Sequence, residues 1–261
     1  MTNTYWRPSS LLGNRNGPAA DPAYAVLVLN QPINENAFKS TVEGASMLVC
    51  ADAGADRLRN LRTDQNWRRP DAIVGDLDSV TPETITYYRG KGVTIVKEPD
   101  QYSTDFTKAL RWIEQEWIQR TEHLDIPPLD VVVLGGLGGR VDQGFSQIHH
   151  LYLAHNDTSL LSGRIYLLSE QSLTFVLGEG PNTIDIEPGY FAENVGIIPI
   201  LGRCHLTTRG LEWDVENWPT DFGGQMSTSN HIRASTIEIS FTGPRPLFTL
   251  ELTALLTATG S

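Results

Sequence analysis

The chain has 261 residues, 40% of them hydrophobic, and its 20 Lys and Arg against 31 Asp and Glu give a formal net charge of −11 at pH 7. This composition supports packed interiors, and the length favours two domains of moderate size. The acidic balance argues against a protein that binds nucleic-acid backbone or an anionic membrane, because both need a basic face. Only two cysteines occur, which indicates a reducing compartment. Without a signal sequence or a membrane-length apolar run, we expect a cytoplasmic protein.

Short apolar runs alternate with helical patterns after a loose N-terminal tail, which we expect over residues 1–21. Continuous apolar runs of this length are typical of strands buried on both faces of a parallel sheet. Thr81 followed by Pro82 predicts a helix start, and a second helix opens near Asp105 and continues through apolar residues at helical spacing. The predicted strands are residues 25–29, 47–50, 72–74, 93–96 and 131–134.

The pattern changes after about residue 164, where the helical period gives way to short alternating runs punctuated by Gly and Pro. Such runs predict antiparallel strands, which we place at 165–168, 173–176, 194–200, 235–241 and 247–252. The fold class is therefore a parallel-sheet α/β domain, residues 22–160, followed by an all-β sandwich domain, residues 161–261.

Carboxylates and glycines directly follow the predicted parallel strands. In an open α/β sheet this edge holds the ligand. Asp76 and Asp78 are two residues apart, so in an extended chain their side chains project to the same side, where Asp105 would join them. Carboxylates and phosphate oxygens are the ligands that Mg²⁺ takes, so the three predict a metal-nucleotide site.

Each of these features also has a plain structural explanation. Asp76 and Asp78 fit a solvated turn, and Asp105 fits the first turn of a helix, where an acid complements the dipole. The glycine-rich stretch 135–139 with Arg140 could bring N–H groups to phosphates, or it could be a tight strand-to-helix turn. It is neither a Walker A loop nor a G-x-G-x-x-G motif, so an NTP-dependent enzyme here would lack a P-loop.

An aromatic cluster and a polar cluster stand out in the β half, around Trp213 and around residues 226–230. A flat ring with nearby Ser and Asn groups suits a planar heterocycle that stacks and forms hydrogen bonds. Alternatively, Trp213 is a core or hairpin side chain.

Taken together, these motifs resemble those of the thiamine pyrophosphokinase family. The stretches that carry the resemblance occur in the family's order, and they are residues 50–55, 75–79, 100–108, 135–143, 210–213 and 227–230.

The resemblance implies a catalytic α/β domain, a β-sandwich that binds thiamine and dimerises, and a homodimer with thiamine sites between subunits. It also implies roles for individual residues. Asp76, Asp78 and Asp105 would hold Mg²⁺ and Gln101 would lie near the reacting hydroxyl and phosphates. The thiamine pocket would include Trp213, Ser229, Asn230 and Gln101, and the ATP phosphates would lie near Asp52, Asp100, Lys108, Arg140 and Asp142.

The implied reaction transfers the pyrophosphoryl group of ATP to the primary hydroxyl of thiamine, giving thiamine diphosphate and AMP. Such transfer depends on alignment and charge neutralisation, so it needs no nucleophilic side chain. Two other functions stay open: a non-catalytic dimer that binds thiamine or a nucleotide, and a Mg²⁺-dependent nucleotide hydrolase. The acidic trio argues against the binder, because like charges are held together at a cost without a metal.

Overall fold

The computed structural model describes residues 3–13, 22–61, 68–124 and 126–257. The chain divides into two compact units, one made of residues 20–170 and the other of residues 1–19 together with 171–260. Among the described residues, no helix is long and apolar enough to cross a membrane.

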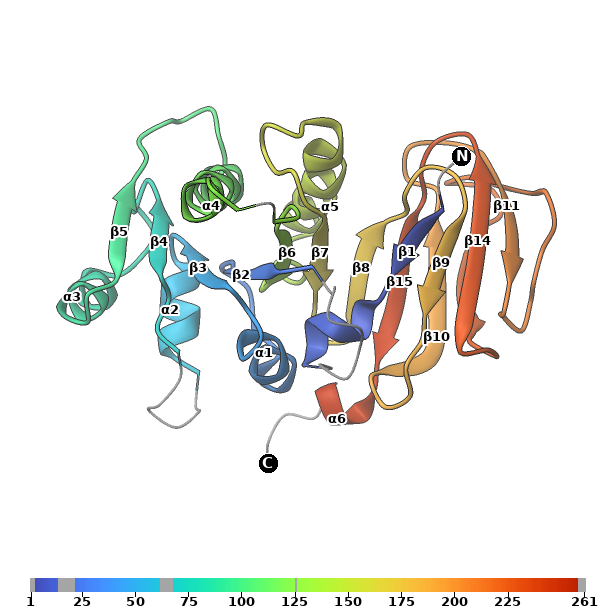
Figure 1. Ribbon diagram of the computed structural model, residues 1–261, viewed down its shortest axis with the longest axis horizontal. Helices are drawn as coiled ribbons and strands as arrows, with labels where there is room; N and C mark the ends of the chain where they lie inside the picture. Colours follow the sequence, from blue (N-terminus) through green and yellow to red (C-terminus); the bar gives the residue numbers. More distant parts are fainter. Residues whose placement is uncertain (1–2, 14–21, 62–67, 125, 258–261) are drawn as a thin grey trace. The chain divides into compact units, whose positions relative to one another are not determined.

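The first unit is an open sheet of six strands in the order β7-β6-β2-β3-β4-β5, with every neighbouring pair parallel (Figure 1). Five of these strands are buried along their whole length, as is typical of continuous apolar runs in a parallel sheet; β5 at the edge is the exception. The six strands are β2 (Tyr24–Val28), β3 (Met47–Ala51), β4 (Ala72–Gly75), β5 (Thr94–Lys97), β6 (Asp130–Leu134) and β7 (Ile165–Leu168).

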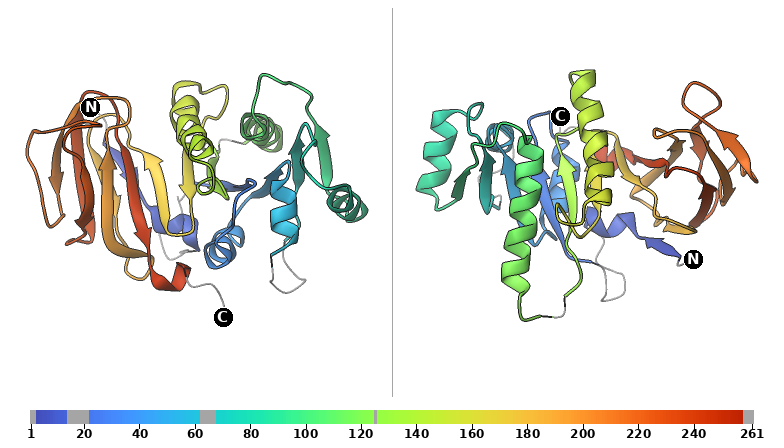
Figure 2. Two further views of the ribbon diagram at one scale, coloured as in Figure 1. Left: turned by 180° about the vertical axis from the view of Figure 1, so that it is seen from behind. Right: turned by 90° about the horizontal axis from the view of Figure 1, so that it is seen from above.

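Helices cover both faces of this sheet, α1 to α3 on one face and α4 with α5 on the other (Figures 1 and 2). This placement follows from right-handed crossovers, because the strand order proceeds from β2 to β5 and then returns through β6 to β7. Thr81 caps α3 and Thr104 caps α4, each accepting a hydrogen bond from a backbone N–H three residues ahead. The helices are α1 (Glu35–Val42), α2 (Gly54–Arg59), α3 (Pro82–Gly90), α4 (Asp105–Thr121) and α5 (Val141–Asn156).

The second unit contains two β-sheets, as the alternating pattern predicts. One sheet has the antiparallel order β8-β15-β10-β13, and the other has the order β1-β9-β14-β11-β12. Their bounds are β1 (Thr4–Trp6), β8 (Ser172–Val176), β9 (Asn182–Asp185), β10 (Phe191–Ile198), β11 (Cys204–Arg209), β12 (Trp218–Thr220), β13 (Ser227–His231), β14 (Thr236–Thr242) and β15 (Leu247–Leu252), with short helices η1 (Pro8–Leu12) and α6 (Ala254–Thr257).

Two predicted boundaries differ from the structure. Residues 165–168 were expected in the β half, but β7 pairs in parallel with β6, so the structural boundary lies at 170/171 and not near 160. A short apolar run looks the same in either kind of sheet, and only its partner decides. The predicted loose tail is also wrong for residues 4–12, because β1 pairs in parallel with β9 and η1 follows it.

Trp6 shows why the N-terminal segment is ordered. Its side chain is 3% exposed and stacks on Phe175 with ring centroids 4.4 Å apart. The indole Nε1 donates a 2.8 Å hydrogen bond to Asn182 Oδ1. A buried aromatic ring with its polar atom satisfied is a strong anchor for a three-residue strand.

We therefore expect Trp6→Ala to lower the free energy of unfolding by about 3 to 5 kcal/mol, because it leaves a large cavity and removes a buried hydrogen bond to Asn182. Tyr5→Ala is the matched control: Tyr5 lies on the same strand, is 64% exposed, and should cost about 0.5 kcal/mol or less. Denaturant unfolding of both variants measures the difference. Equal effects would mean that the segment is not anchored through Trp6.

Candidate active site

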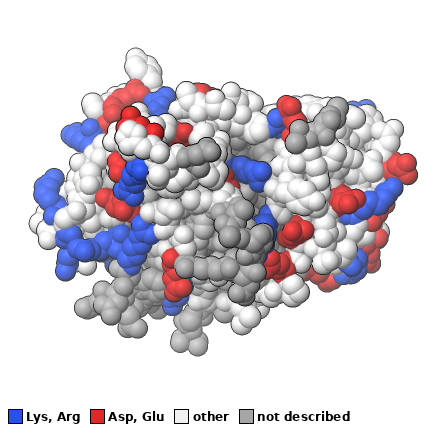
Figure 3. Space-filling view, in the orientation of Figure 1, with Lys and Arg blue, Asp and Glu red and all other residues white. Residues whose placement is uncertain are grey.

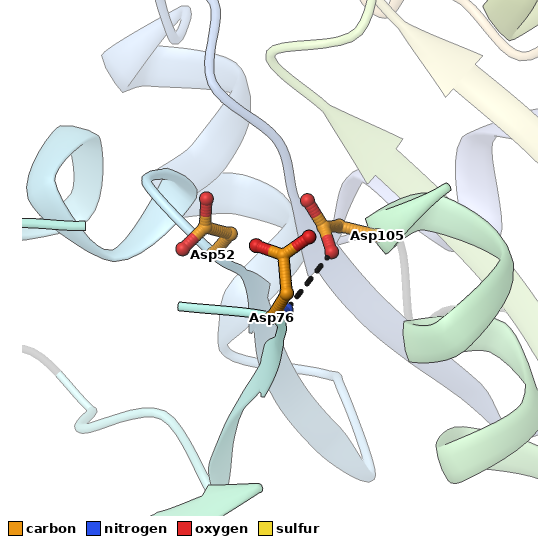
Figure 4. Close-up of side chains that lie close together, drawn as sticks. All are labelled: Asp52, Asp76 and Asp105. Atoms are coloured by element: carbon orange, nitrogen blue, oxygen red, sulfur yellow. Dashed lines mark hydrogen bonds between the residues drawn. The ribbon is translucent and has the colours of Figure 1, made fainter. Parts of the chain in front are cut away.

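Three carboxylates from three parts of the first unit meet at the carboxyl edge of its sheet (Figure 4). Asp52 follows β3, Asp76 follows β4 and Asp105 begins α4. One oxygen from each carboxylate lies within 4.8 Å of the others. The sequence predicts the meeting of Asp76 and Asp105, because strand ends and helix starts share this edge in an open α/β sheet.

Asp52, which the resemblance associates with the ATP phosphates, occupies the position in this cluster that Asp78 was expected to fill. Its side chain accepts hydrogen bonds of 3.2 Å from the N–H groups of Ser79 and Val80. Burial raises the pKa of Asp52, the two N–H donors oppose that effect, and the charges of Asp105 and Asp78 add to it.

Asp78 does not share the cluster in this structure. The expected extended backbone is absent because Leu77 has a φ of 64°, in the left-handed region, so the chain turns directly after Asp76. Asp78 is exposed, its N–H donates to Asp76 Oδ1 at 3.2 Å, and its carboxylate accepts from the Ser79 hydroxyl at 2.7 Å. Two aspartates in such a turn point in different directions.

Lys108 holds two of the clustered carboxylates together. Its side chain is only 2% exposed, and Nζ lies 3.0 Å from Asp105 Oδ1 and 3.3 Å from Asp76 Oδ2. Burial acts to lower the pKa of Lys108, but the two ion pairs outweigh it and raise the pKa. Burial likewise opposes the shift at Asp76, whose pKa is nevertheless lowered by the Asp78 N–H and by Lys108. The Lys108 ammonium group therefore contacts the carboxylates of the cluster and is not exposed at the carboxyl edge of the sheet.

The donor set fits a hard divalent cation. The formal charges of three carboxylates and one ammonium sum to −2, which Mg²⁺ would neutralise, and carboxylate oxygens are the ligands that Mg²⁺ prefers. A further N–H donor supports the arrangement, because the Asp76 amide donates to Asp105 Oδ1 at 3.2 Å.

The remaining predicted residues of this unit lie at the same edge but are more exposed. The glycine loop has positive φ at Gly135, Gly138 and Gly139, as expected for a close backbone turn. Arg140 and Asp142, both exposed, form a two-pronged ion pair with contacts of 3.1 and 2.6 Å.

Two predicted residues precede α4. Gln101 is exposed, and Asp100 accepts a 2.9 Å hydrogen bond from the Tyr102 N–H. Hydrogen bonds from Ser103 and Tyr102 lower the pKa of Asp100, so its carboxylate is ionised at neutral pH.

The predicted aromatic site of the second unit is a pocket of about 210 Å³. Trp213 lines it and is 54% exposed, so it is not a core residue. Asn230 is buried and clamps the Trp213 backbone, accepting from its N–H at 3.1 Å and donating to its carbonyl at 3.0 Å. Ser229 is exposed with a φ of 55° and is not among the lining residues. The apolar part of the lining is completed by Ile197, Leu206, Val215, Trp218 and Met226.

Family models match both parts of the chain. Residues 38–161 match the model described as "Thiamin pyrophosphokinase, catalytic domain", and residues 181–245 match "Thiamin pyrophosphokinase, vitamin B1 binding domain". The chain is 37% identical to thiamine pyrophosphokinase 3 of Oryza sativa subsp. japonica over 241 residues, covering 86% of this chain and 85% of the relative. It is 31% identical to thiamine pyrophosphokinase of Saccharomyces cerevisiae, covering 82% and 80%.

Solved structures agree with the sequence relatives. A thiamin pyrophosphokinase from Candida albicans superposes with a TM-score of 0.82 at 25% identity, covering 96% of this chain and 93% of that one. Yeast thiamin pyrophosphokinase also gives a TM-score of 0.82, at 28% identity, covering 96% and 91%. These neighbours confirm the predicted fold class.

The carboxylate cluster predicts a specific metal-binding phenotype. We expect Asp105→Asn to weaken Mn²⁺ binding by at least about tenfold, since loss of even an outer partner of a ligand commonly costs that much. Titration followed by the electron paramagnetic resonance of free Mn²⁺ measures the affinity. Asp157→Asn is the matched control, because Asp157 is an exposed aspartate of the same unit that pairs with Ser159. Unchanged affinity in both variants would leave Asp105 as a helix-start acid only.

Proposed function

This chain belongs to the thiamine pyrophosphokinase family, and from that premise we propose that it transfers the pyrophosphoryl group of ATP to thiamine. The observation that carries the proposal is the carboxylate cluster of Asp52, Asp76 and Asp105, which lies inside the region that matches the catalytic model. The match of residues 181–245 to a vitamin B1 binding model supports thiamine as the acceptor.

The reaction balances without a covalent enzyme intermediate. The primary hydroxyl of thiamine attacks the β-phosphorus of ATP, the bond from that phosphorus to the oxygen bridging it to the α-phosphorus breaks, and AMP leaves. The hydroxyl proton is lost in the same step. The enzyme's task is alignment and charge neutralisation.

The chain's own residues divide that task. Asp52, Asp76 and Asp105 would hold Mg²⁺, which when bound neutralises phosphate charge and orients the phosphates. Lys108 keeps two of these carboxylates in place, which supports a positioning role. The glycine loop offers backbone N–H groups to phosphates, and Gln101 lies exposed at the same edge. Arg140 would reach a phosphate by exchanging its ion pair with Asp142. We also retain Asp78 as a proposed Mg²⁺ ligand, since its charge acts on Asp52 from beside the cluster.

Further parts of the proposal rest on the resemblance. We retain the homodimer with thiamine sites between subunits and the thiamine contacts of Trp213, Ser229 and Asn230. A cytoplasmic location is also retained, supported by Cys50 and Cys204, which are both buried and free.

The products decide between the proposed function and its rivals. Incubation with MgATP and thiamine should release AMP in step with thiamine diphosphate. In the same assay, Asp76→Asn should lower kcat/KM by about a hundredfold, which corresponds to a loss of ~2.7 kcal/mol of transition-state stabilisation. Separation of AMP, ADP and thiamine phosphates measures this. ADP with thiamine monophosphate would exclude pyrophosphoryl transfer. Nucleotide hydrolysis independent of thiamine would indicate a hydrolase, and binding without turnover would indicate a binder.

Because Trp213 is exposed, we expect its removal to affect ligand binding and not protein stability. Trp213→Ala should weaken thiamine use by about 1 to 3 kcal/mol, because an aromatic stacking surface is lost, while the KM for ATP and the melting temperature stay nearly constant. Phe222→Ala is the matched control, since Phe222 is 61% exposed in the same unit and does not line the pocket. Normal thiamine kinetics in Trp213→Ala would remove this indole from the thiamine site.

A further inference from the structure

A second pocket lies at the opposite edge of the six-stranded sheet. It has a volume of about 720 Å³ and opens where β4 and β5 begin, whereas the carboxylate cluster lies beyond the carboxyl ends of the strands. Its walls are residues 68–71 before β4, residues 91–94 at the start of β5, and one side of α4 with Trp112, Glu116 and Arg120. The proposed transfer reaction uses none of these residues.

The pocket carries an excess of positive charge in a strongly acidic chain. Four cations line it, Arg68, Arg69, Lys91 and Arg120, against the carboxylates of Asp71 and Glu116. The local net charge is therefore +2, whereas the whole chain carries −11. Figure 3 shows Lys and Arg side chains gathered where β5 and α3 lie. A hollow with an excess of one sign of charge concentrates oppositely charged solutes.

The contacts show which charges the carboxylates neutralise. Arg68 pairs with Asp71 at 3.0 Å, and Arg120 pairs with Glu116 at 2.8 Å. Arg69 instead donates to the carbonyl oxygen of Lys91 at 2.5 Å, and Lys91 Nζ lies 5.7 Å from the centre of the Tyr87 ring. A carbonyl and a ring position these two cations without neutralising them. Both side chains are exposed, so their charges stay accessible to a phosphate dianion, which the guanidinium fork binds with good geometry.

Trp112 adds an apolar wall to the pocket. It is half-buried and shares one side of α4 with Glu116 and Arg120, at intervals of four residues. An indole beside cations is a common surface for a flat ring whose substituent is anionic.

We propose that this pocket binds a small phosphate monoester that carries a flat ring, with its dianion at Arg69 and Lys91 and its ring on Trp112. This inference is independent of the proposed function, because neither pyrophosphoryl transfer nor thiamine enters it.

Binding is tested on the full chain labelled with ¹⁵N, in buffer containing EDTA so that no metal can hold phosphate at the carboxylate cluster. The probes are phenyl phosphate and methyl phosphate. The chain has six tryptophans, and the indole signal of Trp112 is assigned by its loss in Trp112→Phe. We expect phenyl phosphate to shift that signal and saturate in the millimolar range, at least threefold tighter than methyl phosphate.

The double variant Arg69→Gln/Lys91→Gln should raise the dissociation constant for phenyl phosphate at least tenfold. Its matched control is Arg89→Gln/Arg203→Gln, which removes the same charge from two exposed positions outside the pocket lining and should change affinity less than twofold. If the first double variant does not fold, Arg69→Gln alone should give at least threefold. An unmoved Trp112 signal, or equal loss in both double variants, overturns the site. Equal affinity for the two probes overturns the role of the ring.

Discussion

The repulsion among three clustered carboxylates is the constraint on which the candidate active site depends. Asp52, Asp76 and Asp105 offer oxygens within 4.8 Å of one another, and like charges at that distance are unfavourable unless a cation lies near them. Lys108 supplies one positive charge from a side chain that is 2% exposed. It neutralises only part of the cluster, so the fold keeps the three aspartates together and still leaves a site that favours a divalent cation.

The pocket around Trp213 in the second unit has a different arrangement, in which the Trp213 backbone is fixed by hydrogen bonds and its ring stays exposed. Asn230 is 5% exposed, and its side-chain amide forms two hydrogen bonds with the Trp213 backbone. The Trp213 ring, 54% exposed, lies 4.9 Å from the ring of His231, which pairs with Glu212 at 2.8 Å. An aromatic surface held this way loses little conformational freedom when a ligand stacks on it. The role expected for Asn230 in thiamine binding is thus accompanied by a structural one.

The sequence predicts strands and helix starts well in the first unit because these signals are local. Runs such as 131–134 and the Thr81 cap depend on a few adjacent residues, and the structure confirms both. The partner of β7, the pairing of β1 with β9 and the turn at Leu77 depend on distant residues or on one dihedral angle, which no local pattern specifies. The position of Lys108 beside Asp105 can be predicted from the sequence, because Lys108 follows Asp105 by three residues on a helix and so lies on the same side. Its burial was not.

The position of Asp105 depends in turn on a buried contact between two helices. His150 of α5 is 2% exposed, and its Nδ1 lies 2.6 Å from the Ser146 carbonyl oxygen, which can only accept. Burial lowers the pKa of His150, so the ring is neutral and the single lone pair of Nε2 accepts from a threonine hydroxyl; the hydroxyls of Thr104 and Thr107 lie 2.9 and 3.0 Å from it. Thr104 is the N-cap of α4, one residue before Asp105. A displacement of α5 would therefore move the start of α4 and with it Asp105 of the carboxylate cluster.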